Sequence, residues 1–178
     1  AEVTLTGATD ENADDNATDL LPVSVREGSK GTIVQLGTDS RRTSSDTPFG
    51  LANKYAAALN LYSAQELGSG SKNIVKAAWP YDASWQHEDA NDLPVRVYMA
   101  NTDRTNNLEG WMPENEMTLV YDGTINIPKE TKGEVAVELT TPFAYQDGKN
   151  LAVLTVVHTD KNLQYTNFYA YKSPLDEN

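Results

Sequence analysis

Cysteine is absent from this chain of 178 residues, and histidine occurs only twice. The lack of cysteine excludes disulfide bonds, thiolate metal ligands and cysteine nucleophiles, but it leaves the cellular compartment open. The sequence also contains no HExxH zinc motif, no P-loop and no dinucleotide-binding glycine motif. Residues 68–71 (GSGS) are not a nucleophile elbow, because they do not join a strand to a helix. We therefore expect a protein without catalytic activity.

Basic residues are scarce: 14 Lys and Arg stand against 26 Asp and Glu, which gives a formal net charge of −12. Such a chain repels nucleic acid and anionic lipid surfaces, so neither is an expected partner. The general interpretation of this acidity is solubility rather than a specific cationic partner. No apolar run approaches the roughly 20 residues that span a bilayer, so we expect no membrane-spanning segment. No signal peptide is visible, although one removed before Ala1 stays an open alternative.

Alternation of apolar and polar residues is the strongest pattern that is present, and it is clearest between residues 93 and 139. Val95, Val97 and Met99 alternate with Arg96 and Tyr98. A period of two predicts half-buried β-strands, whose successive side chains point to opposite faces. The same pattern predicts about ten strands, at residues 3–5, 20–25, 32–36, 54–62, 73–79, 93–100, 117–127, 133–139, 151–157 and 165–171.

Only one helical turn is expected. Ser63 and Glu66 have the spacing of a capping box, and Gly68 is placed to end the turn. Residues 151–157 are apolar on both faces, which predicts a central strand that is covered above and below. We therefore predict one all-β domain, residues 1–178, folded as a two-sheet antiparallel, jelly-roll-like sandwich. A chain of this length buries roughly 70% of its unfolded surface, enough for a core without disulfides.

Six segments carry a resemblance to a known group of modules. They are residues 61–68 (LYSAQELG), 95–105 (VRVYMANTDRT), 111–113 (WMP), 119–124 (LVYDGT), 139–145 (LTTPFAY) and 150–153 (NLAV). In this order they resemble the β-sandwich modules of secreted and surface proteins of gram-negative anaerobes, in the neighbourhood of the gingipain-type adhesin domains. The resemblance implies a jelly-roll-like fold in an exported protein and a non-catalytic role in adhesion, display or carbohydrate binding. It supplies no catalytic residues.

The chain departs from that pattern at residues 80–92 (PYDASWQHEDAND), which we take as the first candidate site. Sugars stack their C–H faces on Trp and Tyr rings, and their hydroxyls bond to Asp, Glu, Asn and His side chains. The structural alternative is that Trp85 plugs the end of the sandwich, as we expect for Trp79 from its strand phase. The predicted ligand-binding residues are the stacking platforms Tyr81 and Trp85 and their polar partners Asp82, His87 and Asp89.

A calcium site is the second candidate. Asp10, Asn12 and Asp14 have the opening spacing of a calcium-binding loop. The match then fails, because Asp15 stands where glycine is needed and Leu21 where a bidentate glutamate is needed. A simpler site that uses the first three side chains and backbone carbonyls is one interpretation, and a solvated acidic loop is the other. Ca²⁺ is the one cofactor that the sequence suggests.

The remaining candidates have structural interpretations. Trp111 precedes a predicted strand, and we expect it to be a structural plug. His158 ends an apolar strand and is expected to be a packing histidine. Tyr165, Tyr169 and Tyr171 share one face of the last predicted strand, and we expect them to pack against the core or a neighbouring domain.

The leading expectation is a non-catalytic carbohydrate-binding or adhesion module of a larger exported surface protein, whose partner is a glycan or a surface protein. The alternative is a structural spacer or protein–protein interaction module that uses an open sheet edge. A glycan-acting enzyme ranks third, because 26 acidic residues give many chance carboxylate pairs. Exposure separates the first two, since a binding module should expose Trp85 or Tyr81 and a spacer should bury both.

Overall fold

The computed structural model describes residues 31–36, 42–44, 48–107, 110–160, 163 and 166–170. The chain divides into two compact units, residues 1–34 and 35–178. The described part of the first unit, residues 31–34, is exposed and forms no strand. Within the described ranges no helix is long and apolar enough to cross a membrane. The expectation of a single domain over residues 1–178 stays a prediction.

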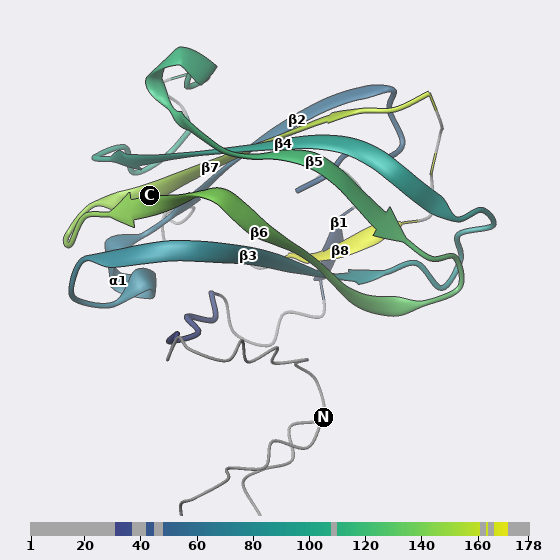
Figure 1. Cartoon of the computed structure of the whole chain (residues 1–178), viewed down its shortest axis with the longest axis horizontal. Coiled ribbons are helices and arrows are strands. Elements are labelled where there is room, and N and C mark those ends of the chain that lie inside the picture. The colour runs from purple at the N-terminus through teal and green to yellow at the C-terminus, as the bar shows by residue number, and fades with distance from the viewer. Residues whose placement is uncertain are drawn as a thin grey trace, which may run out of the picture. The chain divides into compact units, whose positions relative to one another are not determined.

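Two four-stranded antiparallel sheets form the second unit (Figure 1). The described strands are β1 Arg42–Ser44, β2 Tyr55–Tyr62, β3 Lys72–Asp82, β4 Ala90–Thr102, β5 Thr118–Ile127, β6 Lys132–Tyr145, β7 Asn150–His158 and β8 Asn167–Ala170. Sheet A has the order β1-β8-β3-β6, and sheet B has the order β2-β7-β4-β5. The two sheets are the layers of a sandwich, with sheet B uppermost in Figure 1. The predicted all-β, two-sheet architecture is therefore confirmed.

The strand order is nested. β4 pairs with β5, β3 with β6, β2 with β7 and β1 with β8, all antiparallel. Successive nested pairs lie alternately in sheet B and sheet A. This order arises when one long antiparallel hairpin, with β4 and β5 at its tip, is wound around a core. Because most connections then cross between the layers, the loops gather at the two ends of the sandwich.

Alternating apolar side chains from both sheets fill the space between the layers. Val95, Val97 and Met99 of β4 are each at most 2% exposed, as the period-two pattern predicts. Val135 and Val137 of β6 belong to the same buried cluster and contribute to it from sheet A. The core therefore rests on side chains whose strands are far apart in the sequence.

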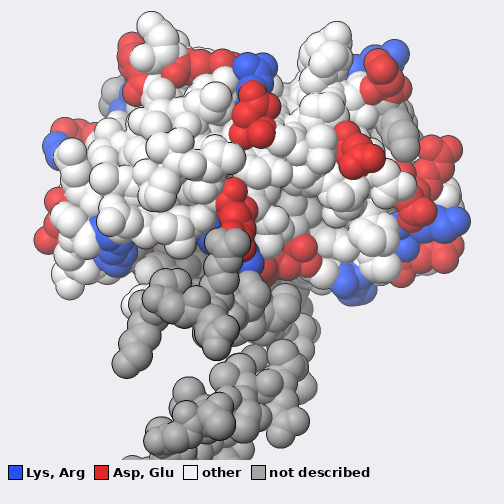
Figure 2. All heavy atoms as spheres, viewed as in Figure 1, with Lys and Arg blue, Asp and Glu red and all other residues white. Residues whose placement is uncertain are grey.

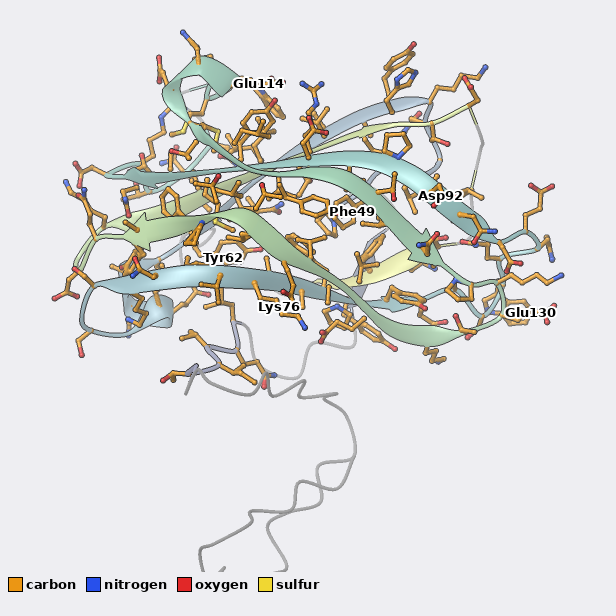
Figure 3. The ribbon with its side chains drawn as sticks, in the orientation of Figure 1. Phe49, Tyr62, Lys76, Asp92, Glu114 and Glu130 are labelled. Atoms are coloured by element: carbon orange, nitrogen blue, oxygen red, sulfur yellow. The ribbon has the colours of Figure 1, made fainter. Side chains whose placement is uncertain are left out.

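The outer face of sheet B carries a second apolar cluster. β7 lies between β2 and β4, and its outward residues Ala152 and Leu154 have no exposed surface. They belong to a cluster with Met112, which comes from the connection between β4 and β5. Glu114 in that connection lies above sheet B in Figure 3. The predicted central strand with both faces covered is therefore confirmed.

Seven of the ten predicted strands are present, and eight strands occur in the described residues. Residues 3–5 and 20–25 lie outside those residues. The predicted strand at residues 32–36 is wrong: Ile33 and Val34 are exposed, while Leu36 packs against the core. β1 falls in a stretch whose composition indicates a loop, and it forms because its backbone pairs with β8.

β6 and α1 can be compared with two predictions that rest on local sequence, the end of a strand and a capping box. β6 continues past the predicted strand end at residue 139 as far as Tyr145, because Phe143 and Tyr145 keep the alternation and are buried. As an edge strand of sheet A, β6 tolerates Pro142. The capping box is confirmed at α1, Ala64–Leu67: the Ser63 hydroxyl accepts from the Glu66 amide, and the Glu66 carboxylate accepts from the Ser63 amide.

Phe168 holds the short strand β8 in the core. Its side chain has no exposed surface, and its ring makes edge contacts with Phe49 at 5.4 Å and Tyr81 at 6.4 Å between ring centroids. Phe49 itself lies between the two layers in Figure 3. Because β8 has only four residues, few backbone hydrogen bonds secure it, and this ring cluster supplies much of its attachment.

We predict that Phe168→Ala lowers the free energy of unfolding by about 3–5 kcal/mol, because it removes a fully buried aromatic ring and leaves a cavity. Urea unfolding followed by circular dichroism measures the change. Tyr169→Ala is the matched control, since the Tyr169 side chain is 38% exposed on the same strand and its loss should cost much less. Equal losses for the two variants would contradict this account of β8.

Candidate functional site

The connection between β3 and β4, residues 83–89, crosses from sheet A to sheet B at one end of the sandwich. We call this segment the Trp85 loop. The β5–β6 turn lies at the same end, because Ala90 at the start of β4 opposes Ile127 at the end of β5. β8 begins there too, with Asn167 opposite Asp82. Glu130 marks this end in Figure 3, and Figure 2 shows acidic and basic side chains close together there.

Gln86 fixes the Trp85 loop from the inside, where it is only 2% exposed. Its amide nitrogen donates to the backbone carbonyl of Glu88 and, at 3.2 Å, to that of Ile127. Its amide oxygen accepts a hydrogen bond from the buried Thr166 hydroxyl. Buried polar groups are costly without partners, so these bonds hold the loop to the end of β5 and to the start of β8.

Backbone hydrogen bonds complete the attachment of the loop. The Ala83 amide donates to the Thr131 carbonyl at 2.8 Å, and the Gln86 amide donates to the Ala83 carbonyl at 3.0 Å. On the far side of the loop, the Asp89 carboxylate accepts from the Lys129 amide at 2.9 Å. The loop is thus joined at both ends to the β5–β6 turn.

Trp85 is a solvent-facing aromatic residue of this attached loop. Its side chain is 74% exposed, although it follows the buried Ala83 and precedes the buried Gln86. Trp79, in contrast, packs on the core and meets the Phe49 ring edge-on at 5.1 Å. The expectation that Trp79 is structural is confirmed, and Trp85 does not plug the sandwich. A large apolar side chain held in water by a fixed loop is available for a ligand.

Tyr81 is not available as a stacking platform, which corrects the prediction for this residue. Its side chain is only 5% exposed. The ring packs against Phe168, and its hydroxyl shares a hydrogen bond with the Thr131 hydroxyl at 3.1 Å. The physical reason is strand phase: Tyr81 still belongs to β3 and points inward, whereas Trp85 lies beyond the end of that strand.

Asp82 is tied into a local ion pair. Its carboxylate lies 2.7 Å from the Lys132 ammonium and accepts from the Ser84 amide at 3.0 Å. Partial burial acts to raise the pKa of Asp82, but the hydrogen bonds from Lys132 and Ser84 outweigh it and lower the pKa below its usual value of 3.8. Asp82 therefore stays charged and braces β3 against β6, next to the Trp85 loop.

His87 and Asp89, the two other predicted polar partners, are exposed on the same loop as Trp85, and Glu88 is exposed between them. Both residues follow Trp85 closely in a segment whose backbone is fixed. A neutral imidazole both donates and accepts hydrogen bonds and a carboxylate accepts them, and these are the contacts that hydroxyl groups of a sugar require. The structure thus exposes Trp85, His87 and Asp89 on one loop and leaves Tyr81 in the core.

Two backbone positions with positive φ border this end of the sandwich. Asp92 has φ 50° and Glu130 has φ 55°, in the left-handed region. Asp92 lies in an irregular part of β4, where its amide donates to the Asn126 side chain at 2.9 Å. Both residues are labelled at this end in Figure 3. Such conformations cost about 1 kcal/mol or more and persist where the surrounding structure enforces them.

The proposed calcium ligands Asp10, Asn12 and Asp14 lie outside the described residues. In the part of the chain that the structure describes, no group of three or more His, Asp or Glu side chains is placed to hold a metal ion. The calcium site therefore stays a prediction.

Trp111 corrects a second expectation. It is 54% exposed and is not a plug; its neighbour Met112, at 5% exposed, fills that role over sheet B. Trp111 belongs to the connection after β4, so it lies at the end of the sandwich opposite the Trp85 loop. Tyr169 is 38% exposed, and Tyr165 and Tyr171 lie outside the described residues.

Sequence reasoning missed two features of this end. Gln86 has no motif that marks it as a buried anchor, because its partners Ile127 and Thr166 are remote in the chain. His158 was expected to pack, yet it is exposed and its ring stacks on Tyr55 with centroids 4.4 Å apart. Only the pairing of β2 with β7 places these two rings together.

No protein-family model matches the chain, and the comparisons with curated proteins and with solved structures also find no match. The resemblance to the gingipain-type adhesin modules therefore stays a prediction.

We predict that Gln86→Leu releases the Trp85 loop and lowers the free energy of unfolding by about 2–3 kcal/mol. The reason is that the Ile127 carbonyl and the Thr166 hydroxyl lose their hydrogen bonds to Gln86 in a buried environment. Hydrogen exchange at residues 83–89 should rise more than in the core strands. Gln65→Leu is the control, since Gln65 is exposed on α1. Unchanged exchange in the loop would show that Gln86 does not anchor it.

A second prediction concerns pH. Because the pKa of Asp82 is lowered in the folded state, its ion pair adds stability above pH 3.8, and that stability is lost as the pH falls through the folded pKa. Lys132→Met should raise the pKa of Asp82 and make unfolding less dependent on pH below 3.8. Carboxyl NMR titration and urea unfolding measure the two effects, with Lys54→Met as the control of equal charge change. An unchanged pKa of Asp82 in the Lys132→Met variant would contradict the ion pair.

Proposed function

We propose that this chain is a non-catalytic carbohydrate-binding module in which Trp85 is the stacking residue. The observation that carries the proposal is the 74% exposure of Trp85 on a loop fixed by the buried Gln86. A spacer has no use for a large exposed aromatic residue on a fixed loop. A sugar-binding protein needs one, because C–H faces of sugars stack on aromatic rings.

The surroundings of Trp85 support the same ligand class. His87 and Asp89 supply a nitrogen and carboxylate oxygens close to the ring in sequence, and both are exposed. The loop is already ordered by its own hydrogen bonds, so less conformational entropy is lost when a ligand binds. An aromatic face beside a few fixed polar groups is the usual chemistry of a sugar site.

The fold is compatible with this role. The nested order, β1-β8-β3-β6 facing β2-β7-β4-β5, supports a jelly-roll topology. Jelly rolls occur in lectin domains, although a fold alone does not specify a function. We further propose, from the resemblance of six segments to adhesin modules, that the chain belongs to a larger exported surface protein that acts in adhesion.

A protein–protein interaction module is the second candidate, and a different surface favours it. Trp111, in the connection that covers sheet B, is 54% exposed, and Leu119 of the neighbouring β5 is 40% exposed. The half-exposed Arg96 lies on the same sheet and donates to the Tyr98 hydroxyl at 3.1 Å. Trp and Arg are common at the energetic centres of protein interfaces.

We predict that the protein binds at least one soluble polysaccharide and that Trp85→Ala weakens binding about tenfold or more. A tenfold loss corresponds to about 1.4 kcal/mol, which one stacked ring with its buried area can supply. Trp85→Phe should keep part of the affinity. Affinity gel electrophoresis against xylan, glucomannan, laminarin and mucin, with and without Ca²⁺, followed by calorimetry, provides the measurement.

Trp111→Ala is the matched control, because it removes an exposed tryptophan from the opposite end of the sandwich. It should leave glycan binding unchanged. Failure of the wild-type protein to bind any of these glycans in either condition, or full binding by Trp85→Ala, would overturn the proposed function.

A further inference from the structure

The Trp85 end of the sandwich holds a second exposed aromatic ring. Among the large apolar side chains that are exposed in the described residues, Trp85 at 74% and Tyr55 at 73% are the most exposed. Tyr55 is the first residue of β2, and it pairs across the sheet with His158, the last residue of β7. An exposed tyrosine at a strand start has no role in the core.

The rings of Tyr55 and His158 are stacked. Their centroids are 4.4 Å apart and their planes differ by 16°. Parallel rings at this distance cover one face of each other. Since β2 is the edge strand of sheet B and β7 is its inner neighbour, the second face of Tyr55 points away from the sheet. His158 thus holds the tyrosine ring upright and leaves that second face to solvent.

The Tyr55–His158 stack and the Trp85 loop lie at the same end. Val157, one residue before the end of β7, pairs with Val95, which lies five residues after the start of β4, and the Trp85 loop leads directly into that start. A hydrogen bond of 2.8 Å from the Thr159 amide to the Lys54 carbonyl fastens the chain just beyond the stack. Both histidines of the chain therefore lie at this end, each with an exposed aromatic residue.

The spacing of the strands sets the size of ligand that can reach both rings. Two strand spacings, about 10 Å, separate β2, which carries Tyr55, from β4, and the five residues from Val95 back to Ala90 add roughly 16 Å along β4 before the Trp85 loop. One pyranose ring cannot stack on two platforms that far apart. A chain of several sugars can cover both.

We propose that Tyr55, supported by His158, is a second stacking site and that the ligand is an extended oligosaccharide that contacts both Tyr55 and Trp85. The inference rests on the proposed function, and it adds a site and a minimum ligand length to it. Two linked contacts raise the affinity more than either contact alone, because the second one forms without a further loss of translational freedom. Affinity should therefore rise steeply with chain length and then level off.

Calorimetry with cello-, manno-, xylo- and laminari-oligosaccharides of one to six units tests the proposal on the full chain. For the series that binds, we expect the hexasaccharide to bind at least tenfold more tightly than the disaccharide. Tyr55→Ala should remove that gain and leave disaccharide binding nearly unchanged. Tyr55→Phe should keep the gain, since the ring remains. Tyr169→Ala, which removes an exposed tyrosine from β8, is the matched control and should behave as wild type.

A second measurement does not depend on affinity. In NMR titrations, the ring signals of Tyr55 and His158 should shift with the hexasaccharide and stay unchanged with the monosaccharide. Hexasaccharide binding by Tyr55→Ala at wild-type strength, with unshifted His158 signals, would overturn the second site while the loss of binding in Trp85→Ala kept the proposed function. Wild-type binding by both alanine variants would overturn the two together.

Discussion

Burial of alternate side chains between two sheets is the interaction on which the rest of this molecule depends, since no disulfide supports the fold. Val97 of β4 and Leu154 of β7 have no exposed surface, on opposite faces of sheet B. The nested winding that buries these faces sends most connections across the ends of the sandwich. The backbone groups of those connections are not paired with strand neighbours, so they need other hydrogen-bond partners.

The Trp85 loop meets that need with a buried side chain. Gln86 supplies the donor and acceptor groups that strand neighbours supply elsewhere, and it does so from a position that is 2% exposed. One consequence is local rigidity. The residue directly before this anchor is the exposed Trp85, so the anchor fixes the backbone that carries the ring.

The two surfaces of the molecule differ in chemistry. The Trp85 end combines two exposed aromatic rings, both histidines and many charged side chains (Figure 2). The covered face of sheet B combines Trp111 and Leu119 with the bonded pair of Arg96 and Tyr98. Polar groups beside aromatic faces suit a hydrated sugar, whereas apolar residues around a partly buried arginine suit a protein surface. The two functions proposed for the chain therefore use different faces.

Local periodicity was sufficient to predict the all-β class, seven strands, the doubly covered β7 and the capping box at Ser63, because each depends on residues close together in the chain. The exposed Trp85 was found as a candidate for the same reason, through its aromatic loop. Tyr81 and Trp111 were misjudged, because strand ends and loop coverage decide which of two neighbouring residues is buried. The anchor at Gln86 and the stack of Tyr55 on His158 depend on pairing between distant segments. The sequence by itself determined which segments are strands, and only the tertiary structure decided which side chains meet at their ends.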